Sequence, residues 1–189
     1  LVSRHGPSDS EALLHFGASG VRQVVDVTAP DGWRRLRQVL GQPTSRDAAR
    51  IQRPVLEALG EIPADARLFF EVMIRFAEDI VTARDLSHRL GLCPTTLTSR
   101  FARVGLPSPK SHLAATRLLL AVLLFERPGF TVADVAYRLD YSSPQSFGRH
   151  VRSLLGITGT ELRRRFSFTV ALERYLVSLI LPYRGIWAE

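Results

Sequence analysis

The feature that most constrains the fold is a helical pattern that occurs twice, and its clearer copy lies in the last third of the chain. Thr131 and Asp134 have the spacing of a capping box, which opens a helix over 132–139. Asp140 follows where a tight turn is needed, and aspartate tolerates a left-handed backbone. Residues 144–152 then begin with proline and continue with helical spacing. The pattern predicts two helices joined by a short turn.

The same pattern occurs about fifty residues earlier. Thr82 and Asp85 repeat the capping pair, Gly91 takes the turn position, and Pro94 opens a second helix. An internal repeat of this kind indicates two copies of one folding unit. In the second helix of each copy we expect the apolar side chains to face inward, namely Leu97, Phe101 and Val104 in the first copy and Phe147, Val151 and Leu154 in the second.

Between the copies, residues 108–127 predict a single long helix. Ser108 is a suitable N-cap, Pro109 suits the first turn, and Pro128-Gly129 ends the segment. A helix of this length spans about 28 Å at 1.5 Å per residue. This length is close to the distance of about 34 Å between successive major-groove faces of B-DNA. Its apolar residues are too numerous for one face, so both copies are expected to pack against it.

The outward faces of the two second helices are polar. Glutamine can pair with adenine, arginine with guanine, and serine or threonine with bases or phosphate. A helix that carries such residues near its N-terminus is typical of one that enters the major groove, and the alternative is a solvated polar face. The residues of interest on these faces are Thr95, Thr96, Thr98, Ser99, Arg100 and Arg103 in the first copy, and Ser143, Gln145, Ser146, Arg149 and Arg152 in the second.

The positive charge of the chain is concentrated around the two copies. Residues 80–166 hold twelve Arg and one Lys against five acidic residues, a balance of +8, whereas residues 1–79 have a balance of −1. A basic segment of domain size predicts a surface that binds a polyanion, although a solvated basic face would have the same composition.

Residues 82–165 resemble the double helix-turn-helix domain of the AraC/XylS family of bacterial transcription regulators. The strongest similarity covers residues 131–163, with Ser-x-x-x-Phe-x-Arg at Ser143–Arg149 and the closing Gly-Ile-Thr at 156–158. The resemblance implies a mainly α, homeodomain-like fold, double-stranded DNA and RNA polymerase as partners, and activation of transcription in the cytoplasm. By matched position it implies base contacts from Thr95, Thr96, Thr98, Ser99, Gln145, Ser146 and Arg149, and phosphate contacts from Arg103 and Arg152.

The N-terminal segment 1–64 is expected to form a small α/β fragment with a sensory or dimerisation role. Residues 1–10 are polar and expected to be loose, a strand is predicted over 20–27 between helices at 11–17 and 33–40, and 42–65 is interpreted as a linker with one short helix. One strand makes no sheet, so its partner should lie outside this chain or in a second copy. The segment faintly resembles the end of a receiver domain.

The DNA-binding domain is expected over 65–166. Asp65 is the expected cap of its first helix, whose apolar face would comprise Leu68, Phe69, Val72, Met73, Phe76 and Ile80. The tail 167–189 predicts an amphipathic helix that ends at Pro182. This tail either packs on the domain or forms a dimer contact, so a homodimer would use 1–64 or the tail.

Other classes of protein find little support. The five histidines are scattered without metal-ligand spacing, and no glycine-rich phosphate loop occurs, so we expect no enzyme, metal or cofactor. The longest apolar run, 118–125, is too short to span a membrane, and a single cysteine, Cys93, suits a reducing compartment. RNA binding is disfavoured because no aromatic stacking platform is present. The main alternative is a helical adaptor that has lost sequence-specific DNA binding.

Overall fold

The computed structural model describes residues 2–3, 25–26, 29, 33 and 46–188. The chain divides into two compact units, residues 1–43 and 44–189. In the first, β1 (Val2–Ser3) pairs in parallel with β2 (Val25–Asp26), so that Val2 lies opposite Val25. The expectation that this strand needs a partner from outside the chain was therefore wrong. Val2 is β-branched and suits a strand, within a segment whose polar composition had predicted a loose end. The helices predicted at 11–17 and 33–40 lie outside the described residues, apart from Trp33.

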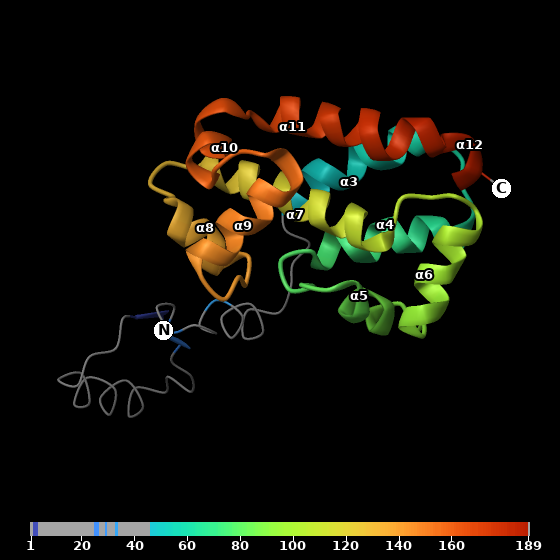
Figure 1. The fold of residues 1–189 in the computed structure, drawn as a ribbon, viewed down its shortest axis with the longest axis horizontal. Helices are drawn as coiled ribbons and strands as arrows, with labels where there is room; N and C mark the ends of the chain where they lie inside the picture. Colours follow the sequence, from blue (N-terminus) through green and yellow to red (C-terminus); the bar gives the residue numbers. More distant parts are fainter. Residues whose placement is uncertain (1, 4–24, 27–28, 30–32, 34–45, 189) are drawn as a thin grey trace. The chain divides into compact units, whose positions relative to one another are not determined.

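Over the described residues 46–188, every regular element of the second unit is a helix, which confirms the mainly α fold class (Figure 1). In chain order its elements are α3 (Arg46–Leu59), α4 (Ala64–Phe76), α5 (Ala83–Arg89), α6 (Pro94–Arg103), α7 (Pro109–Phe125), α8 (Val132–Arg138), α9 (Pro144–Leu155), α10 (Gly159–Arg165), α11 (Phe168–Tyr175), a π-helix (Leu176–Ile180), a 3₁₀ turn (Leu181–Tyr183) and α12 (Arg184–Trp187). No helix among the described residues is long and apolar enough to cross a membrane.

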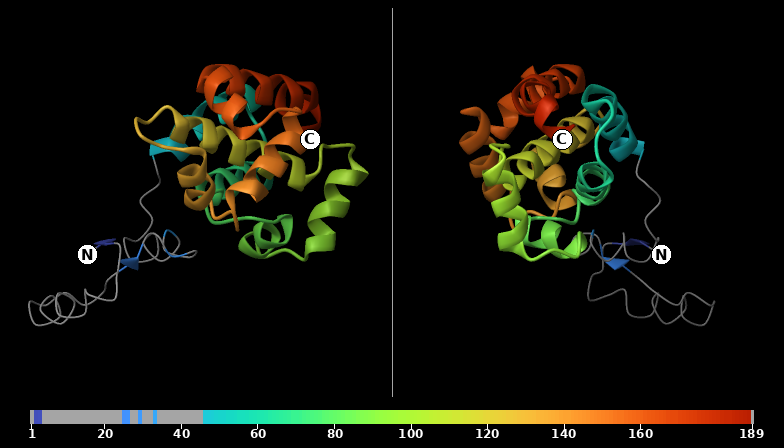
Figure 2. Two further views of the ribbon diagram at one scale, coloured as in Figure 1. Left: turned by 60° about the vertical axis from the view of Figure 1, so that its left-hand side comes forward. Right: turned by 90° about the vertical axis from the view of Figure 1, so that its right-hand side faces the viewer.

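Helix α7 is the centre of this unit. Ser108 caps it through a hydrogen bond from the Ser111 amide, as predicted, and Pro109 is its first residue. Nearly every side chain from Leu113 to Leu124 is buried, because α3, α4, α5, α6, α8, α10 and α11 all pack around it. Figures 1 and 2 show the α5–α6 pair and the α8–α9 pair at its two ends. The prediction that both copies pack on one long helix is confirmed.

Residues 46–59 form a fourteen-residue helix, α3, where the sequence had indicated a linker with one short helix. Ile51, Val55 and Leu59 are fully or almost fully buried, and α3 packs against α4 and α7. Pro54 lies inside this helix and had suggested an interruption. Burial of the apolar face outweighs the one backbone hydrogen bond that the proline cannot donate.

Helix α4 differs from its expectation in two ways. Its N-cap is Pro63, and Asp65 lies inside the first turn, where its carboxylate accepts a hydrogen bond from the Ala66 amide. The buried face is turned toward Phe69, Phe70, Met73 and Ile74, whereas Leu68 is 49% exposed. Apolar residues lie on both sides of the buried face, so the sequence was compatible with two rotations of α4 about its axis.

The C-terminal tail packs on the domain. Phe168, Tyr175, Ile180 and Trp187 are buried, and the segment runs along α7 and α3. It does not end at Pro182 as predicted. Proline sits near the start of a 3₁₀ turn, where its missing N–H costs nothing, and α12 follows.

Candidate nucleic-acid interface

The first helix pair, α5 and α6, is built as the repeat predicts. Thr82 caps α5 by accepting a hydrogen bond from the Asp85 amide (3.1 Å), and Asp85 accepts one from the Thr82 amide (2.9 Å). Gly91 takes a left-handed conformation at the turn, with φ 67°. The Leu92 amide then donates to the carbonyl of Ser87, whose small, fully buried side chain lets the next segment approach closely.

The second pair, α8 and α9, repeats the capping box, the left-handed turn and the closing hydrogen bond of the first pair. Thr131 and Asp134 form the same capping box. Asp140 adopts the left-handed turn with φ 60°, as predicted from its position. The Tyr141 amide donates to the carbonyl of Ala136 at 2.9 Å, the same length as the equivalent bond in the first pair. The internal repeat in the sequence is therefore a repeat in structure.

Helix α6 presents its predicted polar residues to solvent. Thr95, Thr96, Ser99, Arg100 and Arg103 are exposed, while Leu97 and Phe101 are buried. The Thr98 hydroxyl is also exposed but donates to the Pro94 carbonyl at 3.1 Å. Val104, predicted to face inward, is 49% exposed because it follows the last helical residue and lies at the edge of the packing.

At the start of α6, Cys93 occupies the N-cap position but makes no capping hydrogen bond. Its thiol lies 3.3 Å from the Thr95 hydroxyl. Hydrogen bonds from the Thr95 side chain and from the Thr95 and Thr96 backbone lower the pKa of this thiol. The first turn of α6 therefore favours negative charge, as helix N-termini do.

Helix α9 buries Phe147 and Val151 completely. Its predicted outward residues Gln145, Arg149 and Arg152 are exposed, and Ser143 and Ser146 are half-buried. Ser143 is the N-cap, accepting from the Ser146 amide, and the Ser146 hydroxyl accepts from the Arg149 guanidinium at 3.0 Å.

Leu154, in the last turn of α9, was predicted to be buried and is 43% exposed. The adjacent Leu155 packs against the core instead.

A residue that sequence reasoning missed ties the two pairs together. Arg117, on α7, is only 2% exposed. One guanidinium nitrogen donates to the carbonyls of Ala77 (2.7 Å) and Ile80 (2.8 Å), just before the first pair, and the other donates to the carbonyl of Leu139 at the end of α8. The sequence could have indicated this role, because Arg117 is a single arginine inside the apolar run 113–125, and a lone charge buried in a core needs partners.

The turn of the second pair is anchored beneath α9. The Tyr141 hydroxyl is 2.5 Å from Nδ1 of His150, and the Tyr141 ring lies under the Arg117 guanidinium, 4.7 Å from its centroid. Burial, followed by the nearby Arg117 charge, lowers the pKa of His150. Both effects favour the neutral form of this histidine, whose contact with Tyr141 links α9 to the turn.

Comparison with known proteins agrees with this geometry. Residues 86–165 match a family described as a helix-turn-helix domain, and this match supports an AraC-like DNA-binding domain over these residues. No curated protein and no solved structure matches the chain. The matched residues include most of the first pair, all of α7, the second pair and α10. The matched family is one of DNA-binding regulator domains rather than of enzymes.

Proposed function

We propose that this protein is a sequence-specific transcription regulator that binds double-stranded DNA with α6 and α9 in successive major grooves. The observation that carries the proposal is the repeated geometry of the two helix pairs. Both have the same capping box, the same left-handed turn and the same closing hydrogen bond. Two matched units on one scaffold are suited to read two half-sites of a duplex.

The exposed residues of each helix supply the chemistry. On α9, Gln145 suits adenine and Arg149 suits guanine, while Ser146 holds the Arg149 side chain. On α6, Thr95, Thr96, Thr98 and Ser99 would contact bases through shorter side chains. Arg100, Arg103, Ser143 and Arg152 are proposed phosphate partners, which fix position rather than sequence. The second pair is therefore expected to read the more guanine-dependent half-site.

The scaffold between the pairs favours a fixed spacing. The seventeen residues of α7 span about 26 Å at 1.5 Å per residue. Arg117 fastens the segment before α5 to the end of α8 through buried hydrogen bonds. Such a rigid arrangement supports half-sites about 10 bp apart, one turn of B-DNA, on the same side of the duplex.

Two further partners belong to this proposal. An activator would contact RNA polymerase, and a second copy could associate through residues 1–64 or the tail. Val177 and Leu181 are exposed apolar residues of the tail, 56% and 47% accessible, and support its use as a dimer contact. A monomer at micromolar concentration in light scattering would contradict the homodimer.

The test is selection from a randomised duplex pool at two salt concentrations, with wild type, Arg149→Ala and Arg174→Ala. Arg174 is an exposed arginine of α11 and is not among the residues proposed to contact DNA, so it controls for the loss of one charge. We expect a bipartite site whose information is lost at one position in Arg149→Ala only, with a loss of about 1–3 kcal/mol in binding at that base.

Two other outcomes would contradict the proposal. Salt-sensitive binding without an enriched sequence would indicate a DNA binder that recognises only charge. No binding at low salt would favour the helical adaptor instead.

A further inference from the structure

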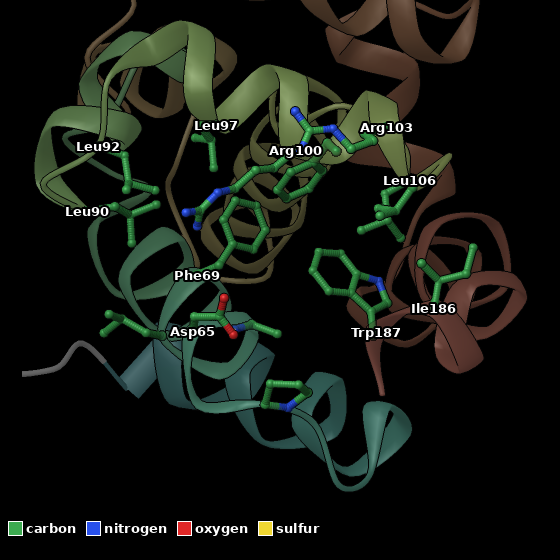
Figure 3. Close-up of a pocket in the computed structure, with 15 residues that line it drawn as sticks. Asp65, Phe69, Leu90, Leu92, Leu97, Arg100, Arg103, Leu106, Ile186 and Trp187 are labelled. Carbon is green, nitrogen blue, oxygen red and sulfur yellow. The ribbon is translucent and has the colours of Figure 1, made fainter. Parts of the chain in front are cut away.

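A pocket beside α6 includes Arg100 and Arg103 of the proposed DNA-binding surface, but its apolar wall is not used by that surface. It has a volume of about 530 Å³ and lies between α4, α6 and α12 (Figure 3). Aromatic side chains of Phe69, Phe101 and Trp187 form part of its wall. Leu68 and Val104 also line it, each 49% exposed, so two exposed apolar side chains lie at the same pocket. Apolar concave sites with a few polar groups are typical of small-molecule binding.

The polar groups at this pocket have unused donors. Trp187 is 5% exposed, and its indole N–H is buried without a hydrogen-bond partner. A buried donor left unpaired costs free energy that a bound acceptor would recover. In Figure 3 the indole nitrogen is turned toward the side of the pocket where Leu106 and Ile186 lie. This side is formed by residues that line the pocket.

Positive charge is also present at the pocket. Arg100 and Arg103 of α6 both line it, and within the part of the chain that the structure describes neither forms an ion pair or hydrogen bond. The acidic residue of the lining is Asp65, one against two arginines. Guanidinium groups next to an apolar wall match a ligand that has a carboxylate on an apolar body.

We propose that this pocket binds a small organic anion with a flat apolar body and one carboxylate. The body packs against Phe69, Phe101 and Trp187, the carboxylate pairs with Arg100 or Arg103, and an acceptor oxygen takes the indole N–H of Trp187. Because both arginines belong to α6, a bound anion would withdraw them from DNA phosphates. This last consequence rests on the proposed function, whereas binding to the pocket does not.

The test uses the indole N–H signal of Trp187 in ¹⁵N-labelled full-length protein. The chain has two tryptophans, so Trp33→Phe assigns the signal. The probes are 2-naphthoate and 2-naphthol at neutral pH, which share the flat body and differ in charge. We expect naphthoate to move the Trp187 proton signal downfield saturably and to bind at least tenfold more tightly than naphthol.

The matched variants are Arg100→Gln/Arg103→Gln and Arg163→Gln/Arg174→Gln, which remove the same charge at exposed sites. The first pair is expected to weaken naphthoate binding at least tenfold, and the second to leave it unchanged. Equal affinity for the two probes, an unmoved Trp187 signal, or equal weakening in both double variants would overturn the site. Naphthoate binding that leaves DNA affinity unchanged would overturn only the coupling to DNA.

Discussion

At the scale of single residues, Arg117 is expected to make a large contribution to the free energy of unfolding. It is buried and donates to three carbonyls from two parts of the chain. Arg117→Met keeps much of the volume but leaves those carbonyls without a donor, and each buried unpaired acceptor costs about 1–3 kcal/mol. We therefore expect urea denaturation to show a loss of at least 3 kcal/mol. The exposed Arg174→Met removes only a surface contact with the Phe166 ring and should lose at most about 1 kcal/mol. A similarly small loss for Arg117→Met would contradict this role.

His112 makes stability depend on pH. It is buried among the rings of Phe69, Phe70 and Trp187, and burial lowers its pKa from 6.5 to about 4. The unfolded chain binds a proton at this histidine below pH 6.5, while the folded chain does so only near pH 4. The contribution of His112 to the free energy of unfolding is therefore fully present above pH 6.5. It falls by about 3 kcal/mol as the pH is lowered to 4.

The measurement for His112 is urea denaturation between pH 4 and 7, with wild type and His112→Phe. The variant should lose a large part of the pH dependence, since phenylalanine does not titrate and suits an aromatic cluster. The same slope in both proteins would show that other groups are responsible.

At the scale of elements, the helix pairs depend on their caps. Thr131 is the N-cap of α8, and its hydroxyl accepts a hydrogen bond from the Asp134 amide. Thr131→Ala removes this hydroxyl. We expect a loss of about 1 kcal/mol in unfolding free energy, and the equivalent Thr82→Ala should cost a similar amount because its geometry is the same. Thermal or urea denaturation measures both. A loss in one and none in the other would show that the two pairs are not energetically equivalent.

The elements with local signals were the ones that the sequence predicted well. Capping pairs, a first-turn proline and a turn residue that tolerates positive φ lie next to one another along the chain, so α5 to α9 were predictable. The exposed polar residues of α6 and α9 followed from the same periodicity.

Other features depend on distant packing. Pro54 lies inside α3 and made the sequence look like a linker with a short helix. The orientation of α4 depends on its packing against α3 and α7. Val104 and Leu154 have the helical spacing of the buried face, so periodicity alone predicted that they face inward. They are exposed because they lie at or beyond the last turn of their helices. The hydrogen bonds of Arg117 join segments about 22 to 40 residues away, which no local pattern reveals.

At the scale of the whole molecule, the helical unit extends beyond the residues that match the family. Helix α3 and the tail cover faces of α7, and this explains why α7 is buried on all sides. The two helix pairs thus sit on a scaffold that has little room to bend. A scaffold of this kind fixes the distance between α6 and α9, the two helices proposed to contact DNA.

The most direct measurement compares affinity for the selected bipartite site with affinity for the same site after insertion of 5 bp between its halves. Half a helical turn places the half-sites on opposite sides of the duplex. If α6 and α9 bind together on a rigid scaffold, fluorescence anisotropy should show at least a tenfold loss of affinity. Insertion should then cost about as much as removing one half-site. Unchanged affinity after insertion would contradict the account, because it would mean that one helix pair binds DNA alone.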